Sequence, residues 1–209
     1  MPSESGAPLC IDLFCGRGGW ARAFLETGYR VVGFDNADMR RWYPGEFVRA
    51  KVECLDGSRF RKATVIVASP PCTRFSTAAG LRRKPEEGMV LVREAFRIGK
   101  EAGIPFVLEN VAGAVKYISA EYGEPRLRAR PFYFWGNFPG FLIHRTPPFF
   151  KSRKLRPSEN PDRCVIKSGP SQGRIIHHNR RDDWGSGESA KVAMIPPEIA
   201  RPLAEALLA

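Results

Sequence analysis

The clearest candidate for covalent chemistry is Cys72, which follows two prolines in the stretch SPPCTRFS at residues 69–76. An apolar run at residues 63–68 comes just before and predicts a buried strand, so the cysteine would stand at a strand end on a stiff backbone. A thiol is a nucleophile when it is ionised, and a neighbouring cation such as Arg74 would favour the thiolate. The alternative for Cys72 is a buried structural cysteine without reactivity.

The second candidate is Glu109, which begins the sequence ENV directly after an apolar run at residues 104–108. The carboxyl ends of neighbouring parallel strands meet at one edge of a sheet, where ligands bind in open α/β folds. A nucleophile and a carboxylate on adjacent strand ends would form one site, so Cys72 and Glu109 are a candidate catalytic pair. Taken singly, Glu109 is also compatible with a helix-capping or surface acid.

The first apolar run, residues 9–14, leads into a glycine-rich turn. The segment DLFCGRGG, Asp12 to Gly19, contains the end of the run and the turn. Such a turn lets a ligand approach the backbone, and the start of the following helix offers free amide groups. Asp35 ends the next predicted strand, about 20 residues further on, where acidic side chains bind ribose hydroxyls in nucleotide sites. The pattern predicts a cofactor site, and the alternative is an ordinary tight turn of a Rossmann-like fold.

The elements that position these residues alternate short apolar runs with helical patterns, which predicts an α/β fold with a mostly parallel sheet flanked by helices. The predicted strands are residues 9–14, 29–34, 63–68 and 104–108, and shorter strand signals follow at FYFW, RCVI and GRII. One helix is predicted between the glycine turn and Gly28, and a second begins at Pro85 and ends at Gly103. Their predicted inward residues are Trp20, Ala23 and Phe24 in the first helix and Met89, Val92 and Phe96 in the second.

Composition divides the chain into three parts. Residues 1–139 form the predicted catalytic and cofactor-binding core, and residues 140–190, rich in Pro, Gly, Arg and Ser, form a small irregular insertion. Residues 191–209 are expected to return to the core as a helix. Pro202 would either kink this helix or mark its first turn.

Charge and composition restrict the class of partner. The 209 residues have a net charge of +11, which favours nucleic acid because phosphate contacts release bound counterions. Five cysteines without a CxxC pair indicate no disulfide framework. No apolar run is long enough to cross a bilayer, and the first residues are not typical of a signal peptide. We therefore expect a cytoplasmic protein without a membrane partner, and its small size suggests a virus or mobile element as its source.

In their order along the chain, these segments resemble the motifs of the cytosine-5 DNA methyltransferase family. DLFCGRGG is similar to the family's cofactor motif, GFDN to its ribose-binding step, PPCTRFS to its nucleophile motif and ENV to its glutamate motif. RLRARPFYFW is similar to its arginine motif, and AMIPPEIARPLAEAL to its closing motif. The resemblance covers residues 9–138 and 190–208, and it implies a Rossmann-like S-adenosylmethionine-dependent methyltransferase fold.

The resemblance implies catalytic roles for four residues. The Cys72 thiolate would add to carbon 6 of a flipped-out cytosine, so that carbon 5 can accept a methyl group. Glu109 would hold ring nitrogen 3 and the exocyclic amine while charge builds up on the ring. Arg130, with Arg128 nearby, would position the base.

The resemblance also implies S-adenosylmethionine as cofactor and no metal. Phe14 would stack on the adenine, Asp35 would bind the ribose, and Pro70 would line the junction between cofactor and cytosine. The implied cofactor-binding residues are Asp12, Phe14, Gly16, Gly18, Gly19, Asp35, Asn36 and Pro70.

The implied partner is duplex DNA, bound by a monomer. The predicted DNA contacts lie around the nucleophile and in the basic loop behind it: Arg74, Ser76, Arg82, Arg83 and Lys84. For the loop, the alternative is a solvated basic segment. Family members read DNA sequence with a separate domain, for which only residues 140–190 are available here. Thr73 stands where the family has glutamine, and Ala193 stands where its closing motif has asparagine.

Three other interpretations remain open. The same chemistry could act on RNA or on a free cytidine nucleotide, although the positive charge disfavours the free nucleotide. The chain could be a non-catalytic nucleic-acid-binding subunit that needs a second chain. His177 and His178, followed by Asp182 and Asp183, suggest a metal-dependent nuclease, but their spacing fits no standard zinc site.

Overall fold

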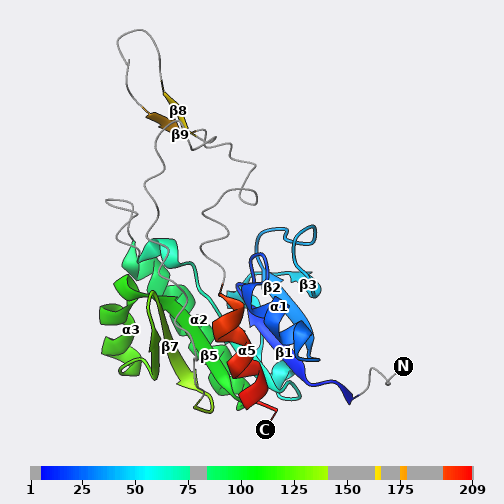
Figure 1. The fold of residues 1–209 in the computed structure, drawn as a ribbon. Coiled ribbons are helices and arrows are strands. Elements are labelled where there is room, and N and C mark those ends of the chain that lie inside the picture. Colours follow the sequence, from blue (N-terminus) through cyan, green and yellow to red (C-terminus); the bar gives the residue numbers. More distant parts are fainter. Residues whose placement is uncertain (1–5, 76–83, 141–162, 166–174, 178–194, 209) are drawn as a thin grey trace. The chain divides into compact units, whose positions relative to one another are not determined.

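The structure is a computed structural model that describes residues 6–75, 84–140, 163–165, 175–177 and 195–208. Its main feature is a seven-stranded sheet with the strand order β3-β2-β1-β4-β5-β7-β6 (Figure 1). The strands are β1 (Leu9–Leu13), β2 (Arg30–Asp35), β3 (Glu46–Arg49), β4 (Val65–Ala68), β5 (Phe106–Val111), β6 (Leu127–Ala129) and β7 (Phe132–Asn137). β1 to β5 pair in parallel, whereas β7 runs antiparallel to both β5 and β6.

The described helices cover both faces of this sheet (Figure 1). α1 (Gly19–Glu26) and α5 (Pro197–Ala206) pack on one face, and α2 (Pro85–Ala102) and α3 (Val115–Tyr122) on the other. This is the predicted α/β architecture, a mostly parallel Rossmann-like sheet between helices. Within the described ranges, no helix has the length and apolar character that a membrane-spanning segment needs.

The core consists of two apolar layers, one on each face of the sheet. Successive strand residues point to opposite faces, so on β1 Cys10 joins the layer beneath α1 and α5 while Ile11 joins the layer beneath α2 and α3. A parallel strand covered on both faces is apolar throughout, and all four residues of β4 are buried. The central strands are therefore fixed by burial on both sides, and their carboxyl ends are held at one edge of the sheet.

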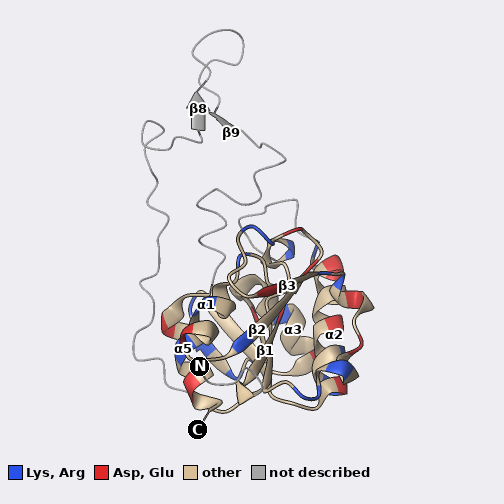
Figure 2. Ribbon diagram, turned by 90° about the vertical axis from the view of Figure 1, so that its right-hand side faces the viewer, with Lys and Arg blue, Asp and Glu red and all other residues tan. Residues whose placement is uncertain are grey.

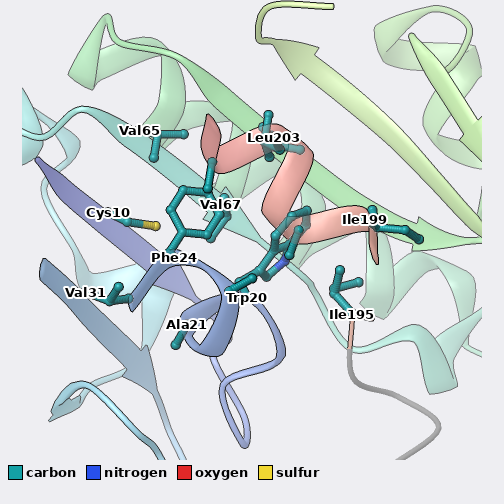
Figure 3. Packing of buried hydrophobic residues seen from close by; sticks show 14 of the residues in the cluster. Cys10, Trp20, Ala21, Phe24, Val31, Val65, Val67, Ile195, Ile199 and Leu203 are labelled. Carbon is teal, nitrogen blue, oxygen red and sulfur yellow. The ribbon is translucent and has the colours of Figure 1, made fainter. Parts of the chain in front are cut away.

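α5 returns the end of the chain to the core and packs beside α1. Ile199 and Leu203 are fully buried, in the same apolar cluster as Trp20 of α1 (Figure 3). The helix begins at Pro197, so Pro202 lies inside it and does not mark its first turn. Pro202 has no N–H to donate, and the carbonyl four residues earlier consequently has no helical donor.

The predicted strands at residues 9–14, 29–34, 63–68 and 104–108 correspond to β1, β2, β4 and β5. Both predicted helices are confirmed, and all their predicted inward residues are buried except Phe96, which is only partly buried. The sequence did not predict β3, α3 or β6 as elements.

Residues Pro148–Ala193 form a separate compact unit. Within it the structure describes two short antiparallel strands, β8 (Arg163–Val165) and β9 (Ile175–His177). The remaining residues of the suggested metal-dependent nuclease site, at 178–183, lie outside the described part of the chain. The predicted domain boundaries near residues 140 and 190 stay predictions.

Candidate active site

Cys72 opens a short 3-10 turn, Cys72–Arg74, which three residues separate from the carboxyl end of β4. Two anchors hold this turn. On one side, the carbonyl of the buried Pro70 accepts a hydrogen bond from the side chain of Asn110 at 3.0 Å. On the other side, Phe75 is fully buried, and its ring packs against an aromatic ring of α3. The thiol between these anchors is half-buried, so a reactant can reach it from the edge of the sheet.

Asn110 links β5 to the nucleophile turn. It is fully buried, and its amide uses both of its polar ends: Nδ2 donates to the Pro70 carbonyl, and Oδ1 accepts from the amide of Val111 at 2.9 Å. The sequence interpretation noted this residue only as the neighbour of Glu109. It missed the structural role because the bonding partner lies 40 residues away in the chain.

We expect Asn110→Ala to lower the free energy of unfolding by about 1–3 kcal/mol, because a buried carbonyl loses its donor. Chemical denaturation measures this loss, and Asn137→Ala, at an exposed position at the end of β7, is the matched control. Equal stability of the two variants would contradict the role of Asn110.

Glu109 lies on the strand next to the nucleophile turn and is only 6% exposed. Burial opposes ionisation and raises its pKa to about 7, and a hydrogen bond with the Ser69 side chain lowers it in part. Ser69 follows β4, which pairs in parallel with β5 through Ala68 and Leu108. The register therefore places Ser69 and Glu109 at adjoining strand ends.

The thiol of Cys72 and the carboxyl of Glu109 influence each other electrostatically. Burial, and then the negative charge of Glu109, raise the pKa of the Cys72 thiol. A thiolate and a carboxylate close together repel each other, so the pair most readily holds one negative charge. Because the pKa of Glu109 is about 7 and burial raises the pKa of Cys72 above its ordinary value, this charge lies mainly on Glu109. The minor form, with the proton on Glu109 and the charge on Cys72, places a nucleophile and a proton donor in one site.

Arg74 does not assist Cys72 in the way that the sequence predicted. Its guanidinium forms an ion pair with Glu87 of α2, with 2.8 Å between nitrogen and oxygen, and it is not among the groups that shift the pKa of Cys72. Lys84 binds the same carboxylate at 2.6 Å, and Figure 2 shows both acidic and basic segments along α2. Two of the predicted DNA contacts are thus paired with one acid. The other three, Ser76, Arg82 and Arg83, lie outside the described residues.

The glycine turn after β1 contains three residues with left-handed backbone: Phe14 with φ 57°, Gly16 with φ 48° and Gly18 with φ 76°. For Phe14 this conformation costs on the order of 1 kcal/mol, and such strain is concentrated at ligand sites. Gly18 is needed for packing as well, because a Cβ there would lie 2.5 Å from Cδ of Pro44. At Gly16 a Cβ would meet nothing within 4 Å, so the space beside this backbone is open.

Asp35, at the end of β2, supports the glycine turn. Its Oδ2 accepts from the amide of Gly16 at 3.0 Å, and its Oδ1 accepts from the amide of Ala37 at 2.9 Å. A carboxylate has about four acceptor positions, so lone pairs remain for hydroxyl donors. The neighbouring Asn36 is exposed, and its carbonyl accepts from Arg49. The ribose contact of Asp35 stays a prediction.

Asp12 is the buried acid of the turn, at 1% exposure. Its Oδ2 accepts a hydrogen bond from the hydroxyl of Tyr43 at 3.1 Å, and its Oδ1 has no partner among the described residues. Burial raises the pKa of Asp12 to about 8, although the bond from Tyr43 lowers it in part. The sequence interpretation missed Tyr43, which belongs to the loop between β2 and β3.

The raised pKa of Asp12 predicts how the stability of the free protein depends on pH. The folded-state pKa of about 8 exceeds the ordinary aspartate value of 3.8, so the contribution of Asp12 to stability is complete below pH 3.8 and is lost as the pH rises through 8. Asp12→Asn keeps an acceptor for Tyr43 but cannot ionise, and we expect its free energy of unfolding to fall less between pH 5 and pH 9. Chemical denaturation across this range checks the slope, with Asp38→Asn at an exposed position as control. An unchanged slope would contradict the assignment.

The arginine motif lies at the far edge of the sheet. Leu127 of β6 is in register, through β7, with Glu109, so the side chain of Arg128 points to the opposite face. There Arg128 forms an exposed ion pair with Glu124. Arg130 follows the strand and is exposed. Contacts of the two arginines with a base stay predictions.

A model of the family described as C-5 cytosine-specific DNA methylase matches residues 9–133, which is more than half of the chain and includes the glycine turn, Cys72 and Glu109. The chain belongs to this family. It is also similar to the Type II methyltransferase M.FnuDI of Fusobacterium nucleatum, with 27% identity over 129 residues. The matched region covers 54% of this chain and 38% of that methyltransferase, so the chain spans well under half of its relative's length.

Solved methyltransferase structures show more distant similarity. S. pombe Dnmt2 is 14% identical with a TM-score of 0.39, over 65% of this chain and 52% of that one. A DNMT2 variant of Spodoptera frugiperda is 17% identical with a TM-score of 0.35, over 51% of this chain and 36% of that one. Magnesium protoporphyrin IX methyltransferase of Synechocystis, with bound S-adenosylmethionine, is 14% identical with a TM-score of 0.40, over 61% and 67%. These TM-scores are low, so membership of the family rests on the sequence match.

Methylases of this family take their methyl group from S-adenosylmethionine, and three features of the chain fit this cofactor. The unpartnered Oδ1 of Asp12 suits an ammonium group, and the space beside Gly16 is open. The first turn of α1, at Gly19, has no side-chain cap, so its amides are available to a carboxylate. Asp12, Gly16 and Gly19, with Asp35, would therefore hold the cofactor, next to the half-buried Phe14.

Proposed function

We propose that the chain transfers a methyl group to carbon 5 of cytosine in DNA through a transient bond between Cys72 and carbon 6. The main support is the pair of adjoining strand ends, where a half-buried thiol stands near a buried carboxyl whose pKa is about 7. S-adenosylmethionine, when bound, supplies an electrophilic methyl group. The family description names DNA, and the net charge of +11 favours a polyanion.

The protonated form of Glu109 is complementary to cytosine. Ring nitrogen 3 of a neutral cytosine accepts a hydrogen bond, and its exocyclic amine donates one. A neutral carboxylic acid offers one donor and one acceptor and can satisfy both, whereas a carboxylate offers acceptors only. A pKa of about 7 keeps a large share of Glu109 protonated near neutral pH.

The reaction follows from the charge distribution of the pair. The Cys72 thiolate forms a bond to carbon 6, and the electrons of the 5,6 double bond move into the ring as Glu109 gives its proton to nitrogen 3. Carbon 5 thereby becomes nucleophilic and accepts the methyl group as the bond between that group and its sulfur breaks. A base then removes the proton of carbon 5, and the electron pair left behind restores the double bond and expels the Cys72 thiolate. Nitrogen 3 returns its proton to Glu109.

The finer features of the substrate are also part of the proposal. A cytosine inside a duplex cannot reach a thiol at the edge of the sheet, so the base must be flipped out of the stack. We propose duplex DNA as the form bound and a single chain as the binding unit. Residues 140–190 would recognise the DNA sequence.

The test is transfer of a labelled methyl group from S-adenosylmethionine to duplex DNA, single-stranded DNA, tRNA and free cytidine nucleotide. We expect label in the duplex, at carbon 5 of cytosine, and bisulfite sequencing then gives its position. If only the tRNA or only the free nucleotide were labelled, that molecule and not DNA would be the substrate. Binding of DNA without binding of the cofactor would support a non-catalytic subunit and overturn the proposal.

A further inference from the structure

Two successive hydrogen bonds between side chains connect α1 to the carboxyl of Glu109. Nε1 of Trp20, in the first turn of α1, donates a hydrogen bond to Oγ of Ser69 at 3.0 Å. The side chain of Ser69 is in turn hydrogen-bonded to that of Glu109. The family match does not assign a role to Trp20 or Ser69, and neither was among the site residues predicted from the sequence, which placed Trp20 only on the inward face of its helix.

Packing holds these hydrogen-bonded side chains in place. Trp20 is 2% exposed, and its ring lies edge-on to Phe24 (Figure 3). The ring of Phe134 lies edge-on to it as well. Phe134 of β7 is in register with Glu109, so the indole and the carboxyl share one face of the sheet. The backbone of Ser69 is fixed as well, because its amide donates to the carbonyl of Leu13 on β1 at 3.2 Å.

The direction of the hydrogen bonds follows from the chemistry of the groups. An indole N–H only donates, so it occupies a lone pair of the Ser69 oxygen. The hydroxyl hydrogen of Ser69 then needs an acceptor, and the carboxyl of Glu109 provides it. A partly buried hydroxyl that turned away would lose this partner, at a cost in free energy. The oxygen of Glu109 that faces Ser69 therefore accepts, and a proton on Glu109 occupies the other oxygen.

We propose that Ser69, oriented by Trp20, is a positioning residue that determines which oxygen of Glu109 holds the proton. Its hydroxyl reserves one carboxyl oxygen as an acceptor and leaves the other to donate. In the proposed reaction, on which this inference rests, the donating oxygen is the one that must meet ring nitrogen 3 of the cytosine. Ser69 thus presents the acid in its productive form without touching the substrate.

The first experiment measures the titration of Glu109 in the free protein, by NMR of glutamate labelled with ¹³C at the carboxyl carbon. Ser69 donates to the carboxylate and so lowers the pKa of Glu109, and we expect Ser69→Ala to move the titration midpoint up by about one pH unit. Ser119→Ala is the matched control, because this α3 serine is only partly exposed and its hydroxyl has no partner among the described residues. Its midpoint should equal that of the wild type.

Two further variants separate the hydroxyl from its surroundings. Ser69→Thr keeps a hydroxyl, and its midpoint should return to the wild-type value. Trp20→Phe keeps an aromatic ring but loses the N–H, and its midpoint should rise in the same direction. If Trp20→Phe does not fold, the comparison of Ser69→Ala with Ser69→Thr decides alone.

The second experiment measures the pH profile of methyl transfer for the same variants. We expect Ser69→Ala to react about tenfold more slowly near neutral pH, and the alkaline limb of its profile to move up together with the Glu109 titration. A midpoint that Ser69→Ala leaves unchanged would overturn this inference, whether or not the chain is active. A shifted midpoint in a chain that methylates no nucleic acid would instead leave the inference standing and refute the proposed function.

Discussion

Replacing Cys72 by alanine is expected to reduce methyl transfer to cytosine by a factor of about 10⁴ or more, because the variant lacks the sulfur that forms the bond to carbon 6. The fold should survive, since the side chain is half-buried and the turn is held by its neighbours Pro70 and Phe75. Single-turnover transfer of labelled methyl groups measures the loss.

Cys72→Ser refines this prediction. A serine hydroxyl fits the same space but ionises far less readily than a thiol, so we expect a loss close to that of the alanine variant. Cys54→Ala, at an exposed cysteine after β3, is the control and should keep the wild-type rate. Transfer by Cys72→Ala within tenfold of the wild-type rate would refute the nucleophile.

Replacing Glu109 by glutamine is expected to lower the transfer rate by about 10²–10³, because the amide cannot give a proton to ring nitrogen 3. The same change should make Cys72 more reactive toward iodoacetamide at neutral pH. The negative charge of Glu109 raises the pKa of the thiol, and without it the thiolate fraction increases.

These opposite effects distinguish the proposed role from simple damage to the site. Glu205→Gln, at an exposed position on α5, should change neither the transfer rate nor the alkylation of Cys72. Mass mapping identifies the alkylated cysteine. If Glu109→Gln transferred methyl groups at the wild-type rate, Glu109 would not be the proton donor.

The elements that the sequence predicts well are those whose burial fixes their pattern. β4, with the sequence VIVA, is buried on both faces and reads as an uninterrupted apolar run. β3, with the sequence EFVR, has no fully buried residue, and α3 buries only Ile118. Such elements have little hydrophobic periodicity, and they form because their neighbours in space support them.

The candidate site divides in the same way. Cys72 and Glu109 are predictable because each comes soon after an apolar run, although β5 extends through Glu109 to Val111, and parallel strands end at one edge. The roles of three other residues depend on partners far away in the sequence, which no local pattern indicates. Asn110 bonds to a residue 40 positions away, and Tyr43 to one 31 positions away. The partners of Ser69 are Trp20, 49 positions away, and Glu109. Arg74 illustrates the opposite error, since it is adjacent to the nucleophile in sequence but its guanidinium is bound by Glu87 of α2.

The central claim is a covalent bond between the sulfur of Cys72 and carbon 6 of cytosine, and trapping tests it most directly. A duplex that contains 5-fluorocytosine, incubated with the chain and S-adenosylmethionine, has no proton to lose from carbon 5 after methylation, so elimination is blocked. We predict a stable protein–DNA adduct that withstands denaturation and that mass spectrometry assigns to Cys72. Normal methylation of ordinary cytosine without any adduct at this residue would contradict the mechanism.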